Sequence, residues 1–172
     1  SRDGTIFDPT GQGVADARAG RIVFVGDPEQ RLREDHLRNL RFFRFQAWFG
    51  KGEPDAAAVA ACAALKAGVE GLAAERISKE LLKLLAADDP RTAVRLMAGA
   101  GVLETILKTP ANLARFDALV EIETDLLFEC EPALRLAALL PDDPLAARRL
   151  AERLRLSNAD RDRLQADRKS VV

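Results

Sequence analysis

Residues 27–50 read DPEQRLREDHLRNLRFFRFQAWFG, and this stretch decides the fold. It begins with a favoured helix start, because Asp27 suits the N-cap and Pro28 suits the first helical position. The pattern predicts a helix that runs from here to Phe49, with a break near Arg33, and the glycines that follow would end it.

Charged and apolar residues separate on this predicted helix at about 100° per residue. The charged face consists of Arg31, Glu34, Asp35, Arg38 and Arg41. Leu37, Leu40, Phe43 and Ala47 lie mostly opposite. Beyond Arg41 aromatic residues return to the charged side, which is typical of a helix buried between two bodies. Five of the nine aromatic residues fall within residues 42–49, so we expect the densest part of the core here.

The rest of the chain is predicted to be helical and is punctuated by prolines. Ile77, Leu81, Leu84 and Leu85 show the spacing of a core-facing helix. Helices are expected near residues 55–68, 73–87, 91–99, 101–108, 111–128, 132–139, 144–154 and 158–167. The fold class is therefore mainly α, an irregular helical bundle without a fixed repeat period.

A short β-ribbon is expected at the N-terminus. Residues 5–8 (TIFD) and 21–25 (RIVFV) are rich in strand-forming residues, and the segment between them carries glycines and a proline typical of a turn. Because two strands alone are marginally stable, we expect the ribbon to belong to a larger sheet.

Composition limits the function classes. Lys and Arg (26) nearly balance Asp and Glu (27), so any nucleic-acid binding must come from local patches. His36, Cys62 and Cys130 are too few for a His/Cys zinc site, and no metal site is expected. The cysteines are interpreted as core residues of a reduced, intracellular protein. No signal peptide or membrane-spanning run is seen, and no membrane partner is expected.

Asp35 and Arg38 have two interpretations. As an exposed pair three residues apart on a helix they would contribute less than about 1 kcal/mol to stability. Alternatively, a carboxylate beside a guanidinium could read a nucleotide base. Cytosine and adenine present an amino group beside a ring acceptor, which complements this pair, whereas uracil and guanine present the reverse order.

The stretch GRIVFVGDPEQRLREDHLRNLRFFRFQAWFG, residues 20–50, closely resembles the neck of bacterial CCA-adding tRNA nucleotidyltransferases, which are related to bacterial poly(A) polymerase. The matching pattern is GDPxxRxxEDxLRxLRxxRF. Residues 73–85, AAERISKELLKLL, resemble a helix of the family's body domain, and residues 149–164 also fit the body. The resemblance covers nearly the whole chain. It implies three parts: the end of a head domain and hinge (1–26), a neck (27–52) and a helical body (53–172).

The resemblance also implies roles for single residues. Asp35 and Arg38 would be the template that selects incoming CTP or ATP, with Glu34 orienting them and Arg41 as a further contact. These residues match the motif together with Arg31 and Arg44, whose role is either phosphate contact or a structural ion pair. In the body motif, Glu75 and Arg76 are assigned to packing.

No catalytic residue is expected in this chain. The family's two metal-binding carboxylates lie in an N-terminal head, so the chain is interpreted as an inactive neck-and-body fragment, and Mg2+ would be bound by the missing head. The implied partners are tRNA, CTP and ATP, and the implied compartment is the cytoplasm. The oligomeric state is left open.

Three alternatives stay open at this point. The parent enzyme could be a poly(A) polymerase or an A-adding relative of the family. The chain could instead be a noncatalytic helical RNA-binding module whose arginines contact phosphates, which predicts steep salt dependence and no base preference. The third alternative is a helical scaffold with no nucleotide contact.

Overall fold

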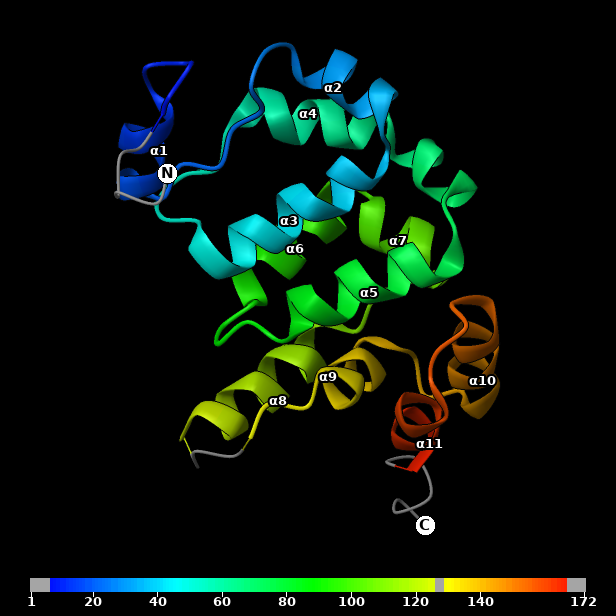
Figure 1. The fold of residues 1–172 in the computed structure, drawn as a ribbon. Coiled ribbons are helices and arrows are strands. Elements are labelled where there is room, and N and C mark those ends of the chain that lie inside the picture. The colour runs from blue at the N-terminus through cyan, green and yellow to red at the C-terminus, as the bar shows by residue number, and fades with distance from the viewer. Residues whose placement is uncertain (1–6, 126–128, 167–172) are drawn as a thin grey trace.

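The computed structural model describes residues 7–125 and 129–166. In these ranges the chain forms eleven α-helices and one 3-10 helix (Figure 1). They are α1 (Gly13–Ala19), α2 (Pro28–Glu34), α3 (Leu37–Phe49), α4 (Ala56–Ala64), η1 (Lys66–Gly71), α5 (Ala74–Leu85), α6 (Arg91–Gly99), α7 (Val102–Leu107), α8 (Leu113–Asp125), α9 (Pro132–Leu139), α10 (Pro144–Arg153) and α11 (Asn158–Ala166). The mainly α fold class is confirmed. None of the described helices is long and apolar enough to cross a membrane.

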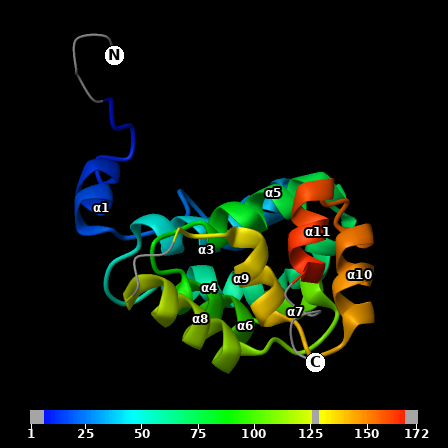
Figure 2. The ribbon, with the colours of Figure 1, turned by 90° about the horizontal axis from the view of Figure 1, so that it is seen from below.

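Helix α3 lies at the centre of one half of the bundle and packs on α5 and α6, while α2 packs on α4 (Figure 1). Helix α9 joins this half to the C-terminal helices, because it contacts α5 as well as α8 and α11. Helix α1 stands apart from the other helices at the N-terminal edge (Figure 2). The bundle is thus irregular, as expected, and the packing of α3 on α5 is its most extensive helix contact.

The predicted N-terminal β-ribbon is wrong. Where a turn was expected the chain forms helix α1, and residues 21–25 contain no strand in the described structure. Residues 5 and 6 of the other predicted strand lie outside the described residues, and residues 7 and 8 are not in a strand. The last residues of the helices predicted over 111–128 and 158–167 also lie outside them.

Residues 21–25 are rich in strand-forming residues, but the segment packs on a helix instead. Ile22 and Phe24 pack against the core, whereas Val23 and Val25 are exposed. Phe24 stacks on Phe42 of α3, with 5.6 Å between the ring centroids. Period-two burial therefore arises here from one extended segment lying on a helix, without a partner strand.

The aromatic end of α3 is only partly buried. Phe42 and Phe43 are in the core, but Phe45, Trp48 and Phe49 are exposed by 38%, 47% and 56%. The expectation of a helix buried between two bodies is therefore wrong for its last turns. The N-terminal half of α3 does pack as predicted, because Leu37 and Leu40 are buried.

The two cysteines differ in their surroundings. Cys62 is buried in the core, and burial raises the pKa of its thiol to about 12. Cys130 is exposed, which corrects its assignment to the core. Both thiols are free.

A buried ion pair ties the C-terminal helices to the end of α5. Arg135 of α9 is 2% exposed, and its Nε lies 2.6 Å from Glu123 Oε2 of α8. Its Nη1 donates to the carbonyls of Leu85 (2.7 Å) and Ala87 (2.6 Å), just where α5 ends. One guanidinium therefore pairs with one oxygen of a buried carboxylate and satisfies carbonyls at the end of α5.

Candidate functional site

The predicted template residues lie at the junction between α2 and α3. The stretch predicted as one helix is two helices, and the break falls at Asp35 and His36, slightly later than predicted near Arg33. Asp35 has an extended backbone (φ −154°, ψ 105°), and its Oδ1 accepts a hydrogen bond from the Leu37 amide at 3.0 Å. This side chain thus satisfies an amide of the first turn of α3, as capping side chains do.

Glu34 lies between two guanidinium groups. Its Oε2 is 2.5 Å from Arg31 Nη1 and 2.5 Å from Arg38 Nη1. The Arg38 Nη1 also donates to the Arg31 carbonyl at 2.8 Å. The hydrogen bond from Arg38 and the charge of Arg31 hold the pKa of Glu34 below its ordinary value of 4.5. Arg38 is therefore fixed by Glu34 and the α2 backbone.

Asp35 is held from a different direction. Its Oδ2 lies 3.3 Å from Nη2 of Arg76, on α5. Partial burial acts to raise the pKa of the Asp35 carboxyl. The Leu37 amide and the charges of Arg76 and Arg41 outweigh that effect, so this pKa lies below its ordinary value of 3.8. The surface interpretation assumed an ion pair between the side chains of Asp35 and Arg38. These side chains instead pair with Arg76 and Glu34.

Arg41 and Arg44 converge on one carboxylate of α5. Glu80 has a side chain that is 8% exposed, and its Oε2 lies 2.6 Å from Arg44 Nε. Its Oε1 lies 3.5 Å from Arg41 Nε, at the edge of hydrogen-bonding range. Arg44 is therefore engaged in a structural ion pair, while Arg41 remains 46% exposed beside the junction.

Two residues of this arrangement were missed or misassigned from the sequence. Arg76 was assigned to packing, but it reaches Asp35. Glu80 was not singled out at all. The sequence feature that could have identified Glu80 is its place at the edge of the apolar stripe of α5. A carboxylate at such a position requires a cation from a neighbouring element.

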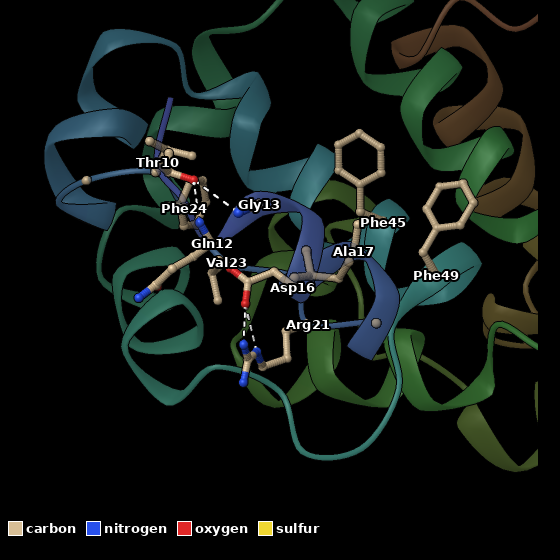
Figure 3. Close-up of a pocket in the computed structure, with 14 residues that line it drawn as sticks. Thr10, Gln12, Gly13, Asp16, Ala17, Arg21, Val23, Phe24, Phe45 and Phe49 are labelled. Carbon is tan, nitrogen blue, oxygen red and sulfur yellow. Dashed lines mark hydrogen bonds and ion pairs between the residues drawn. The ribbon is translucent and has the colours of Figure 1, made fainter. Parts of the chain in front are cut away.

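A separate cavity of about 540 Å³ lies between the N-terminal segment and the C-terminal half of α3 (Figure 3). It is lined by α1, residues 20–26 and the rings of Phe45 and Phe49. The Asp16–Arg21 ion pair, 2.5 Å, lies at its wall. None of the predicted template residues lines this cavity.

The described residues do not fit a metal centre, because no three His, Cys, Asp or Glu side chains gather in residues 7–125 and 129–166. The charged groups at the α2–α3 junction are instead carboxylates already paired with arginines. What this junction can do chemically is present a fixed acceptor, Asp35, near a fixed donor, Arg38.

Comparison with known proteins agrees with this fold. Residues 53–113 match the family described as "Probable RNA and SrmB- binding site of polymerase A". The CCA tRNA nucleotidyltransferase 1, mitochondrial, of Mus musculus is 38% identical over 121 residues, which cover 67% of this chain and 27% of the relative. The CCA-adding enzyme of Streptococcus gordonii is 32% identical over 131 residues, covering 75% of this chain and 32% of the relative. That of Latilactobacillus sakei is 30% identical over 168 residues, covering 95% and 41%.

The helical fold and the matched segment indicate the class, a helical region similar to the segment described for polymerase A. The relatives then identify the family: the chain belongs to the CCA-adding enzymes and corresponds to their body region. It spans between 27% and 41% of the length of these relatives.

Proposed function

We propose that this chain is the nucleotide-selecting and RNA-binding part of a tRNA nucleotidyltransferase that adds C and A, from CTP and ATP, to the tRNA 3′ end. The names of the relatives and the RNA-binding family match support the RNA-binding and transfer parts of this proposal. Selection of the base is assigned to the α2–α3 junction, with Asp35 and Arg38 as the reading pair.

The observation that carries the selection step is that Asp35 and Arg38 are held by different partners. Glu34 fixes the guanidinium, and Arg76 with the Leu37 amide fixes the carboxylate. Neither group neutralises the other, and each keeps hydrogen-bonding capacity, because a carboxylate has about four acceptor positions and a guanidinium has five donors. The pair can thus accept from the amino group of cytosine or adenine and donate to the adjacent ring acceptor.

Uracil and guanine would meet this pair with a carbonyl facing the carboxylate. The wrong base leaves a polar group unpaired, and each good two-point contact is worth about 1–3 kcal/mol of discrimination. Arg41, exposed beside the junction, is proposed as a further contact, and Arg31 as an indirect one through Glu34.

The transfer step itself is proposed to use Mg2+ held outside the residues of this chain. Residues 7–125 and 129–166 do not fit a metal site, so they are assigned no part in binding the ion. The cytoplasm is the proposed compartment, on the resemblance to bacterial enzymes.

The test is nucleotide incorporation into a tRNA that lacks its 3′-terminal CCA, using the full-length enzyme that contains this chain. We expect Arg38→Ala to lower the preference for C and A over U and G by about tenfold or more, which corresponds to the loss of one two-point contact. Arg95→Ala, which removes an exposed arginine from α6, is the control and should retain the preference. Unchanged base preference in Arg38→Ala would refute the template assignment.

A poly(A) polymerase or A-adding relative is the second candidate, which the family description "polymerase A" favours. The same assay separates the two, because that candidate extends the RNA with A alone. A noncatalytic RNA-binding module would add no nucleotide and would show no base preference.

A further inference from the structure

The solvent side of α3 and α5 carries cations and a ring in addition to the Asp35–Arg38 reading pair. We call this the α3–α5 face, and it consists of Arg41, Trp48, Arg76, Lys79 and Lys83. The two helices lie side by side (Figure 1). Trp48 Nε1 donates to the Lys83 carbonyl at 2.7 Å, which fixes the ring against α5.

Positive charge is concentrated on this face and the adjoining α2–α3 junction, although the whole chain has a net charge of −1. Together they contain seven cations and four carboxylates: Arg31, Arg38, Arg41, Arg44, Arg76, Lys79 and Lys83, with Glu34, Asp35, Glu75 and Glu80. Each of the four carboxylates is already paired with arginine. Lys79 and Lys83 are exposed and make no ion pair with any described residue. The local charge is therefore available to an anionic partner.

An exposed aromatic ring stands among these cations. Trp48 is 47% exposed, although it is anchored by its indole N–H. Beside it, the Arg44 guanidinium lies 4.3 Å from the centroid of the Phe45 ring. Cations along a groove together with aromatic rings are typical of surfaces that bind single-stranded nucleic acid, where phosphates meet the cations and bases stack on the rings.

We propose that the α3–α5 face binds a single-stranded RNA segment that leads to the α2–α3 junction. This inference rests on the proposed function, because the RNA 3′ end must reach a nucleotide held at that junction. Ten residues of α3 separate Arg38 from Trp48, a length of about 15 Å at 1.5 Å per residue. About four stacked nucleotides span this length at roughly 3.4 Å each. A duplex is excluded as the occupant of the Trp48 position, because its bases are already stacked and paired.

The salt dependence of RNA binding tests the charge part of the proposal. The probe is a fluorescein-labelled single-stranded RNA of mixed sequence, about 12 nucleotides long, titrated with this chain between roughly 50 and 300 mM salt. Loss of two phosphate contacts in Lys79→Gln/Lys83→Gln should reduce the slope of log K against log salt by about 1.4, at roughly 0.7 per contact. Arg148→Gln/Arg149→Gln on α10 removes the same net charge and should leave the slope unchanged.

Trp48 tests the stacking part. It is the single tryptophan of the chain, so RNA that stacks on it should quench the protein's tryptophan fluorescence. Trp48→Leu should weaken RNA binding by about tenfold, whereas Trp48→Phe, which keeps a ring, should weaken it less. Circular dichroism of each variant verifies that the helices are retained.

Any one of four results would overturn the proposal, and the first three concern the variants, the fluorescence and the duplex. They are an unchanged salt slope in the Lys79/Lys83 variant, RNA binding that leaves Trp48 fluorescence unaltered, and equal or tighter binding of a duplex of the same length. A wild-type chain that binds no RNA also overturns it. The proposed function is judged separately, by base preference in Arg38→Ala, and that result does not depend on the salt slope.

Discussion

Asp35 combines a local and a long-range contact within one side chain. Its Oδ1 is set by the backbone two residues on, and its Oδ2 is set by Arg76, which is 41 residues away in sequence. A carboxylate held at both oxygens has a fixed plane, and a fixed plane is what a base-reading acceptor needs. Arg76 is therefore a positioning residue for the proposed template.

Substitution of Arg76 should loosen base selection without touching the base. In the full-length enzyme we expect Arg76→Ala to reduce the preference for C and A over U and G several-fold, because Asp35 loses its partner. Arg76→Lys should restore part of it, since lysine supplies charge without the planar fork of arginine. The measurement is the ratio of correct to incorrect incorporation. If Arg38→Ala lowers this ratio but Arg76→Ala leaves it at the wild-type value, Arg76 has a packing role only.

Individual elements differ in how well the sequence predicts them. The apolar spacing of α5 identified its buried stripe, because Ile77, Leu81, Leu84 and Leu85 are all buried. The same reasoning placed most helix boundaries within a few residues, since prolines and capping residues mark them locally. The fold class could thus be predicted, because helix periodicity is a local property.

Contacts between elements could not be predicted in the same way. The Arg76–Asp35 and Glu80–Arg44 pairs depend on how α5 lies against α3, and no spacing within either helix contains that information. The strand prediction for residues 21–25 failed for a related reason, because strand-forming composition does not show whether a partner strand is present. For Asp35 and Arg38 the residues alone left two interpretations open, and the resemblance favoured the template role, which stays a prediction.

Gly68 of η1 lies close to His36, the residue that precedes α3. A Cβ added at Gly68 would lie 2.2 Å from His36 Nδ1. Gly71, in the same 3-10 helix, has nothing within 4 Å of an added Cβ. Gly68 therefore leaves room for the imidazole next to Asp35.

These two glycines form a matched pair for a stability measurement. Gly68→Ala should lower the free energy of unfolding by about 1–3 kcal/mol through overpacking against the ring. Gly71→Ala should change it by less than about 1 kcal/mol, because the added methyl group meets open space. Urea unfolding followed by circular dichroism measures both. Equal effects at the two positions would argue against a close contact between Gly68 and His36.

Over the whole molecule, ion pairs give stability a defined pH dependence. The pKa values of Glu34, Glu75 and Asp89 are lowered by hydrogen bonds from Arg38, Arg155 and Arg91, from ordinary values of 4.5, 4.5 and 3.8. A carboxyl whose pKa is lower in the folded state stabilises that state above its unfolded pKa, and the contribution is lost as the pH falls through the folded pKa.

We therefore expect the melting temperature to be nearly constant from about pH 7 to about pH 5.5 and to fall below about pH 4.5. Thermal unfolding followed by circular dichroism, at fixed ionic strength, measures this. Added salt should reduce the difference in melting temperature between the two pH ranges, because salt screens exposed ion pairs. A melting temperature that rises as the pH falls from about 5 to about 3.5 would contradict the assigned sign.

The buried Arg135 guanidinium limits which helices can unfold locally. Separation of α9 from both α5 and α8 would leave the Glu123 carboxylate without its arginine and the carbonyls at the end of α5 without their donor. Partial opening between these helices is therefore disfavoured, and we expect α5, α8 and α9 to unfold together. Proteases that act on locally opened forms should then find little to cleave here short of global unfolding.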